Sequence, residues 1–153
     1  MWGGSCDTYI AKVEKIHIDA MRLVTGATAR SNIQRLYKET GWQSIHSRCN
    51  MAMVIMIFKI KNQWTPNYLF ELLPQANAAY ISYSLRNNEN IKVPCTKREA
   101  FRRSFFPTAI RLWNKLQESV RNSQTINILK LSMALVISSN FPDLSLGVFY
   151  QET

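Results

Sequence analysis

The sequence predicts a mainly α-helical protein, a compact helical cluster with a small β-hairpin or extended segment near residues 80–93. Three observations support this fold class. Apolar residues recur at three-to-four spacing in several stretches, which is the period of one helix face. Residues 51–58 are apolar on every side, so a helix there belongs at the centre of the cluster. Finally, 153 residues that are 46% hydrophobic are enough for one domain with a core.

The first helix is predicted to begin at Ser5 or Asp7 and to end at Gly26. Serine and aspartate accept hydrogen bonds from the first free N–H groups of a helix, and glycine commonly follows its last turn. The expected buried stripe consists of Ile10, Val13, Ile16, Ala20, Met21 and Val24.

The next two helices follow closely. Ser31 and Gln34 have the spacing of a capping box, which predicts a short helix that Gly41 ends. A third helix is expected over about residues 44–61, from Ser44 to Lys61, with the fully apolar stretch in its middle. We therefore expect this third helix to be central.

The pattern changes after a short fourth helix. Thr65 and Pro66 form an N-cap and first-turn pair for that helix, and Pro74 stops it. Its apolar residues are Leu69, Phe70, Leu72 and Leu73. Residues 80–85 then have the composition of a strand, and residues 91–93 could return beside it after a polar turn.

A last strong helix is predicted from Thr108 to about Val120. Its apolar stripe contains Ile110, Leu112, Trp113 and Leu116. Phe105, Phe106 and Trp113 are all candidates for stacking on nucleic-acid bases. Because Trp113 lies on the apolar stripe, packing in the core is favoured for it. No basic residue follows Lys130, so residues 2–131 are taken as the main module and residues 132–153 as an unrelated, weakly ordered tail.

The charge balance favours a polyanionic partner. The chain has 19 Lys and Arg against 10 Asp and Glu, a net charge of +9, and a pI of about 9.8. Between Arg86 and Arg121, nine cations and three glutamates leave +6. The candidate residues for sequence-independent contact with RNA or DNA are Arg86, Lys92, Lys97, Arg98, Arg102, Arg103, Arg111 and Lys115. The alternative is a solvated face that keeps the chain in solution.

Other compartments and chemistries are disfavoured. Three widely spaced cysteines predict no disulfide framework. Neither a signal peptide nor a membrane span is indicated, so an intracellular protein of the nucleus or cytoplasm is expected. The three aspartates are scattered, which disfavours two-metal catalysis, and no phosphate-binding glycine loop occurs, so we expect no enzyme and no cofactor. A metal site at His46 and Cys49, completed by Cys6, His17 or Cys95, was weighed and disfavoured because its spacing is not that of a zinc finger.

Five blocks, in a fixed order, resemble a known family. They are Trp2-Gly3-Gly4; Arg22-Leu23-Val24-Thr25-Gly26; Leu36-Tyr37-Lys38-Glu39-Thr40-Gly41-Trp42; Tyr83-Ser84-Leu85-Arg86-Asn87-Asn88; and the stretch from Arg102 to Leu116. The last block is the most specific, with a basic stretch, paired aromatics, proline and Leu-Trp-Asn-x-Leu. Together they resemble the C-terminal region, downstream of the polymerase palm, of jockey-like LINE-type (non-LTR) retrotransposon reverse transcriptases.

The resemblance implies a non-catalytic remnant of a transposable element. Neither the paired aspartates of the family's polymerase motif nor its endonuclease can be located. In the family the palm precedes the Trp-Gly-Gly block, whereas here only Met1 precedes it, so the chain is expected to be truncated. The retained module would contact template RNA or target DNA. Two alternatives stay open: a structural or self-associating interaction protein that uses surface left uncovered by the palm, and an element fragment with no selected function.

Overall fold

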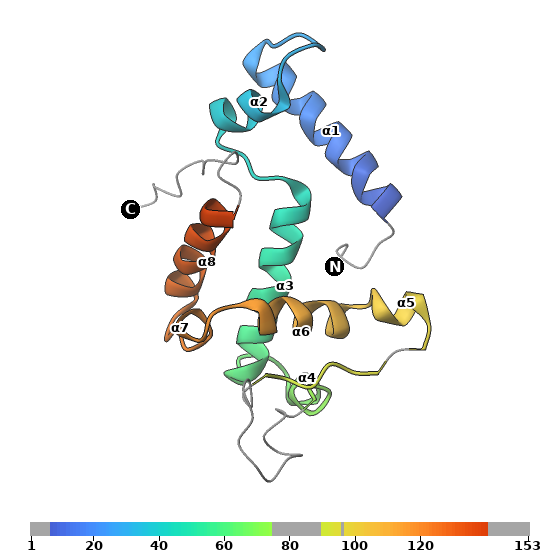
Figure 1. Cartoon of the computed structure of the whole chain (residues 1–153), viewed down its shortest axis with the longest axis vertical. Helices are drawn as coiled ribbons and strands as arrows, with labels where there is room; N and C mark the ends of the chain where they lie inside the picture. The colour runs from blue at the N-terminus through green and yellow to red at the C-terminus, as the bar shows by residue number, and fades with distance from the viewer. Residues whose placement is uncertain (1–6, 75–89, 96, 141–153) are drawn as a thin grey trace.

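A central helix, α3 (Ile45–Lys61), organises the molecule, and α1, α4, α6 and α8 all pack against it (Figure 1). The computed structural model describes residues 7–74, 90–95 and 97–140. Ser44 caps α3 by accepting a hydrogen bond from the Ser47 N–H. The buried residues of α3 are Met51, Met53, Val54, Ile57, Phe58 and Ile60. The mainly helical fold and the central position of this helix are confirmed.

The first two helices form one end of the molecule. Helix α1 (Asp7–Thr25) ends where Gly26 adopts a φ of 66°, and α2 (Ile33–Thr40) ends at Gly41 with a φ of 67°. The predicted capping box at Ser31 is wrong. The Asn32 side chain, not that of Ser31, accepts a hydrogen bond from the N–H of Gln34, so the helix begins one residue later.

The predicted apolar stripe of α1 is only partly buried. Met21 is completely buried, but Ile16 is 68% exposed and Val24 is 70% exposed. The reason is that α1 packs mainly on α2 and α3, which cover its Met21 side. Several apolar side chains of α1 therefore face solvent.

Helix α4 (Asn67–Glu71) is shorter than predicted and begins after Pro66, which itself occupies the N-cap position in place of Thr65. The expected strand over residues 80–85 and its turn lie outside the described residues. In the described segment 90–95, Ile91 forms an isolated bridge and is buried, but no longer strand occurs there.

The predicted helix from Thr108 to Val120 is instead two helices. Helix α6 (Phe105–Lys115) starts earlier because Pro107 fits in the first turn, where backbone N–H groups have no partner within the helix. At Leu116 and Gln117 the backbone is extended, and a short helix, α7 (Glu118–Arg121), follows. The basic stretch before α6 forms another short helix, α5 (Glu99–Arg102).

Helix α8 (Ile126–Asn140) crosses the boundary expected between residues 131 and 132. Met133 and Ala134, which lie beyond that boundary, are buried, and α8 packs against α3 and α7. Residues 141–153 lie outside the described part. In the ranges that the structure describes, no helix has the length and apolar character needed to cross a membrane.

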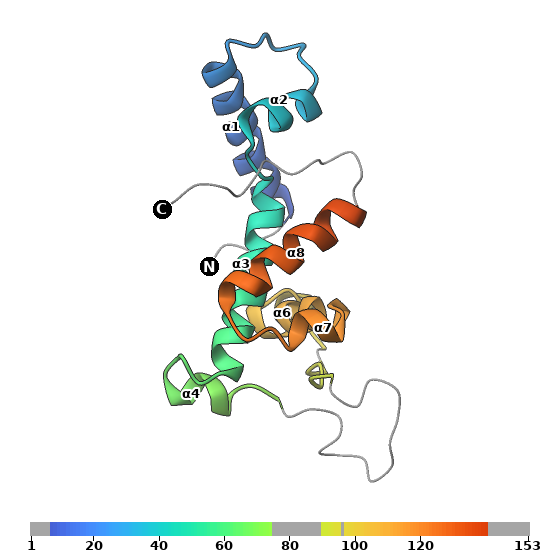
Figure 2. The same cartoon turned by 90° about the vertical axis from the view of Figure 1, so that its left-hand side faces the viewer.

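The main core lies where α6, α7 and α8 meet the later part of α3, and both views show α6 crossing that part of α3 (Figures 1 and 2). Besides the α3 residues it contains Ile91, Ala109, Ile110, Trp113, Val120, Leu129 and Met133. This packing fixes α6, and with it the cations that α6 presents to solvent.

Candidate nucleic-acid interface

Three arginines come together where α5 joins α6. The Arg111 guanidinium donates a hydrogen bond from Nη1 to the Arg102 carbonyl oxygen at 3.5 Å, which links the two helices. Arg102 and Arg103 both pair with the carboxylate of Glu99, at 2.8 and 2.9 Å. We call Glu99, Arg102, Arg103 and Arg111 the basic corner.

Glu99 pairs with two of these arginines and leaves both of them exposed to solvent. The side chains of Arg102 and Arg103 remain 56% and 42% exposed. The hydrogen bonds from Arg103 and then Arg102 lower the pKa of Glu99, so the carboxylate is charged at neutral pH. The basic corner therefore carries three positive charges and one negative charge. The spacing of three and four residues between Glu99 and the two arginines is the sequence signal for this pairing.

The other predicted cations precede or follow the basic corner in the sequence. Lys97 and Arg98 are exposed immediately before α5, and Lys115 is exposed one turn beyond Arg111 on α6. Lys92 is exposed and follows Ile91, whose backbone N–H and carbonyl are hydrogen-bonded to the Asn114 side chain of α6. Arg86 lies outside the described residues.

Trp113 is a core residue, as predicted, with 1% of its surface exposed. The ammonium group of Lys61 lies 5.1 Å from its ring centroid, so α3 covers the indole from one side. Phe105 and Phe106 are half-buried, and their rings meet edge to face with centroids 5.2 Å apart. Trp113 is therefore inaccessible to a base.

The residues weighed for a metal site do not gather in the described part of the chain, where no three His, Cys, Asp or Glu side chains form a cluster that could hold an ion. His46 is exposed and Cys49 is half-buried on α3. Cys6 lies outside the described residues.

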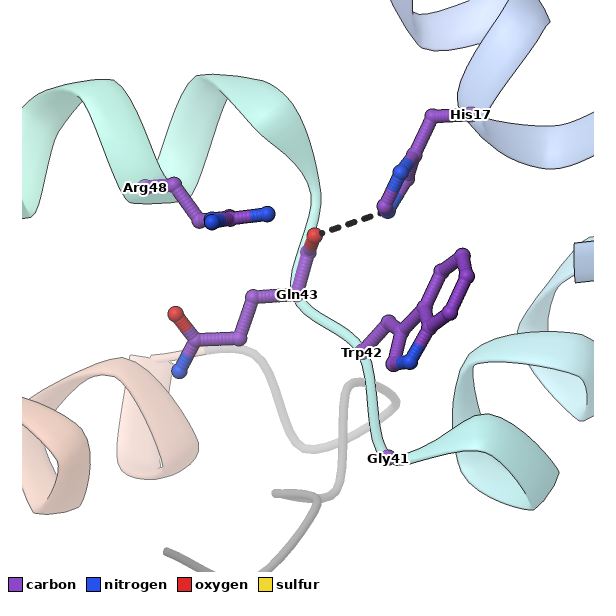
Figure 3. A pocket seen from close by; sticks show the side chains of 5 residues that line it. All are labelled: His17, Gly41, Trp42, Gln43 and Arg48. Carbon is purple, nitrogen blue, oxygen red and sulfur yellow. Dashed lines mark hydrogen bonds between the residues drawn. The ribbon is translucent and has the colours of Figure 1, made fainter. Parts of the chain in front are cut away.

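A pocket that the sequence analysis did not identify lies at the other end of α3 (Figure 3). Its volume is about 420 Å³ and it is lined by His17, Gly41, Trp42, Gln43 and Arg48, which we call the His17 pocket. His17 stacks on Trp42, with centroids 5.1 Å apart and an interplanar angle of 28°. Because a carbonyl can only accept, His17 donates its Nε2–H to the Gln43 carbonyl oxygen, at 3.2 Å.

Glu14 fixes the three segments that form this pocket. One carboxylate oxygen of Glu14 accepts the hydroxyl hydrogen of Tyr37 on α2, and the other accepts the N–H of Ile45 at 2.8 Å. Ile45 is the first residue of α3, where a carboxylate is favoured by the free N–H groups and the helix dipole. Burial, followed by the hydrogen bond to Glu14, raises the pKa of Tyr37.

Comparison of the chain with protein-family models, with curated proteins and with solved structures finds no match.

Proposed function

We propose that this chain is a non-catalytic nucleic-acid-contacting module similar to the region downstream of the palm in LINE-type reverse transcriptases. The observation that carries the proposal is the convergence of Arg102, Arg103 and Arg111 at the basic corner. These arginines belong to the most specific of the five blocks that resemble the family. Lys97, Arg98 and Lys115 extend the positive surface along the chain on both sides.

The physical basis of the contact is the exchange of counterions. Each guanidinium that meets a phosphate releases condensed cations from the nucleic acid, which gives an affinity that is independent of sequence and sensitive to salt. Arginine also presents a planar fork of N–H groups that fits phosphate oxygens.

The decisive experiment replaces Lys97, Arg98, Arg102 and Arg103 with Ala and measures binding to unrelated duplexes over a range of salt concentrations. The slope of log affinity against log salt should become shallower by up to about 3.6 units, since each of the four lost phosphate contacts accounts for about 0.9. The matched control replaces four exposed cations at the other end of the molecule, Lys12, Lys15, Arg30 and Lys38. An unchanged slope in the first variant, or equal losses in both, would remove the proposal for the basic corner.

A second candidate function is self-association, supported by exposed apolar side chains on α1 and around α4. Leu23 is 85% exposed and Val24 is 70% exposed on α1, while Trp64, Tyr68 and Leu72 near α4 are 57%, 60% and 59% exposed. Apolar surface of this kind favours protein contacts that survive high salt. Light scattering at high salt tests this function: stable oligomers support it, and a monomer at every salt concentration contradicts it.

A further inference from the structure

The His17 pocket combines an aromatic surface with a fixed orientation. His17 stacks on one face of the Trp42 indole and is itself held by the Gln43 carbonyl, while 39% of Trp42 stays exposed. Figure 3 shows the His17 and Trp42 rings on one side of the Gln43 backbone. An indole that is held by a stacked ring and keeps 39% of its surface exposed offers a surface on which a planar ring can stack.

The same pocket has a cation that the described part of the chain does not neutralise. Arg22, Arg35, Arg102 and Arg103 each pair with a carboxylate, whereas the exposed Arg48 side chain has no ion pair or hydrogen bond among the described residues. No acidic residue lines the pocket. In Figure 3 the Arg48 guanidinium lies across the Gln43 carbonyl from His17. The pocket is therefore suited to a ligand that has both a planar ring and a negative charge.

The pocket is also preformed. Glu14 ties α1 to α2 through Tyr37 and to the start of α3 through Ile45, so the helices that carry the lining residues are joined next to it. Its volume of about 420 Å³ is within the range of small-ligand sites. A preformed site avoids the cost of ordering loops when the ligand binds.

We propose that the His17 pocket binds one unpaired nucleotide of a single-stranded nucleic acid, with the base on Trp42 and a backbone phosphate at Arg48. This inference rests on the proposed function, because it names the form of nucleic acid that the module prefers. A nucleotide supplies the planar ring and the negative charge in one unit, and base–aromatic stacking tolerates any sequence. Bases inside a duplex are already stacked and paired, so a duplex cannot enter the pocket.

The pocket and the basic corner are separate enough to be tested apart. Helix α3 has 17 residues and is about 25 Å long at its rise per residue. Arg48 lies in its first turn, whereas α6 crosses its later part (Figures 1 and 2). A single strand of about five nucleotides, at the lower end of known single-strand site sizes, is therefore the probe that fills the pocket with the least contact at the corner.

The experiment measures binding of three probes of equal length to the full chain: a single strand of about five nucleotides, the same strand without bases, and the corresponding duplex, its strands joined by a non-nucleotide linker so that it stays paired. Trp42→Leu should weaken binding of the single strand roughly 5- to 150-fold, with no effect on the strand without bases. Trp42→Tyr keeps an aromatic face and should restore most of the affinity. Arg48→Gln should reduce the salt slope for the single strand by about 0.7.

Matched control variants test whether the effects are specific to the pocket, and they distinguish a failure of this inference from a failure of the proposed function. Trp64→Leu and Lys38→Gln change exposed residues outside the pocket and should leave all three affinities unchanged. Equal binding of the single strand by wild type and by folded Trp42→Leu, or equal binding of the strands with and without bases, overturns the pocket inference. The proposed function is decided independently, by the salt slope on a long duplex of the variant in which Lys97, Arg98, Arg102 and Arg103 are replaced with Ala.

Discussion

The side-chain amide of Asn114 hydrogen-bonds to both backbone groups of Ile91. Its Nδ2 donates to the Ile91 carbonyl oxygen at 2.8 Å, and its Oδ1 accepts from the Ile91 N–H at 3.1 Å. The amide thus satisfies both backbone groups of this buried residue, which would otherwise lack hydrogen-bond partners within their own segment. This pairing gives a structural reason for the Trp-Asn pair on α6: Trp113 enters the core, and Asn114 fastens residues 90–93 beside it.

Replacing Asn114 with Ala should destabilise the fold by about 1–3 kcal/mol, because a buried N–H and C=O lose their partners together. Urea unfolding followed by circular dichroism measures the change. Asn127→Ala, at an exposed position on α8, is the control and should change stability by less than about 0.5 kcal/mol. Equal stability of the two variants would show that Ile91 does not depend on Asn114.

Replacing Trp113 with Ala should cost about 3–5 kcal/mol, because the ring is completely enclosed by the core. In a marginally stable domain this loss is enough to unfold a large fraction of the molecules. Thermal unfolding is the measurement, and Trp64→Ala, at an exposed indole, is the matched control. A folded and stable Trp113→Ala variant with weaker nucleic-acid binding would contradict the structural role.

Glu99→Gln should strengthen nucleic-acid binding, whereas replacing the arginines should weaken it. The substitution removes the negative charge at the basic corner and releases two guanidinium groups from their carboxylate. The salt slope should steepen by up to about 0.9, the value of one phosphate contact. Glu71→Gln makes the same charge change on exposed α4 and should have little effect on the slope. Weaker binding by folded Glu99→Gln would mean that the carboxylate is needed to position the arginines.

Tyr37 should make the stability of the protein sensitive to alkaline pH. Its folded-state pKa is raised above the usual value of about 10, first by burial and then by the hydrogen bond to Glu14. Folding favours the neutral phenol, so this contribution is complete below about pH 10 and is lost as pH rises through the folded-state pKa. Ultraviolet titration should show a phenol that ionises well above the usual pKa of about 10, and Tyr37→Phe should remove that late step. Tyr68→Phe, at a phenol that is 60% exposed, should leave the late step in place.

The elements with an unambiguous signal were predictable from sequence. A stretch that is apolar on all sides identified α3 as the central helix, and Gly41 identified the end of α2, because only a residue without a Cβ adopts its positive φ easily. The break at Leu116 and Gln117 was missed because neither residue is Gly or Pro. Tertiary packing of Val120 in the core, and not local preference, places the turn there.

The candidate sites were predictable to different degrees. The cations of the basic corner were identified by residue type, but their arrangement depends on the joint between α5 and α6. The His17 pocket had no local signal. His17 and Gln43 are 26 residues apart and meet only because α1 and α2 fold back on each other.

Helix α8 separates two kinds of boundary that are often assumed to coincide. The module boundary predicted from sequence lies at Leu131, but the core continues to Met133 and Ala134, which pack inside the same fold. A hydrophobic core selects side chains by volume and spacing and is indifferent to their ancestry. A fragment cut after residue 131 would therefore lose the second half of a helix and open the core beside α3, so a boundary drawn from sequence likeness is not a folding boundary.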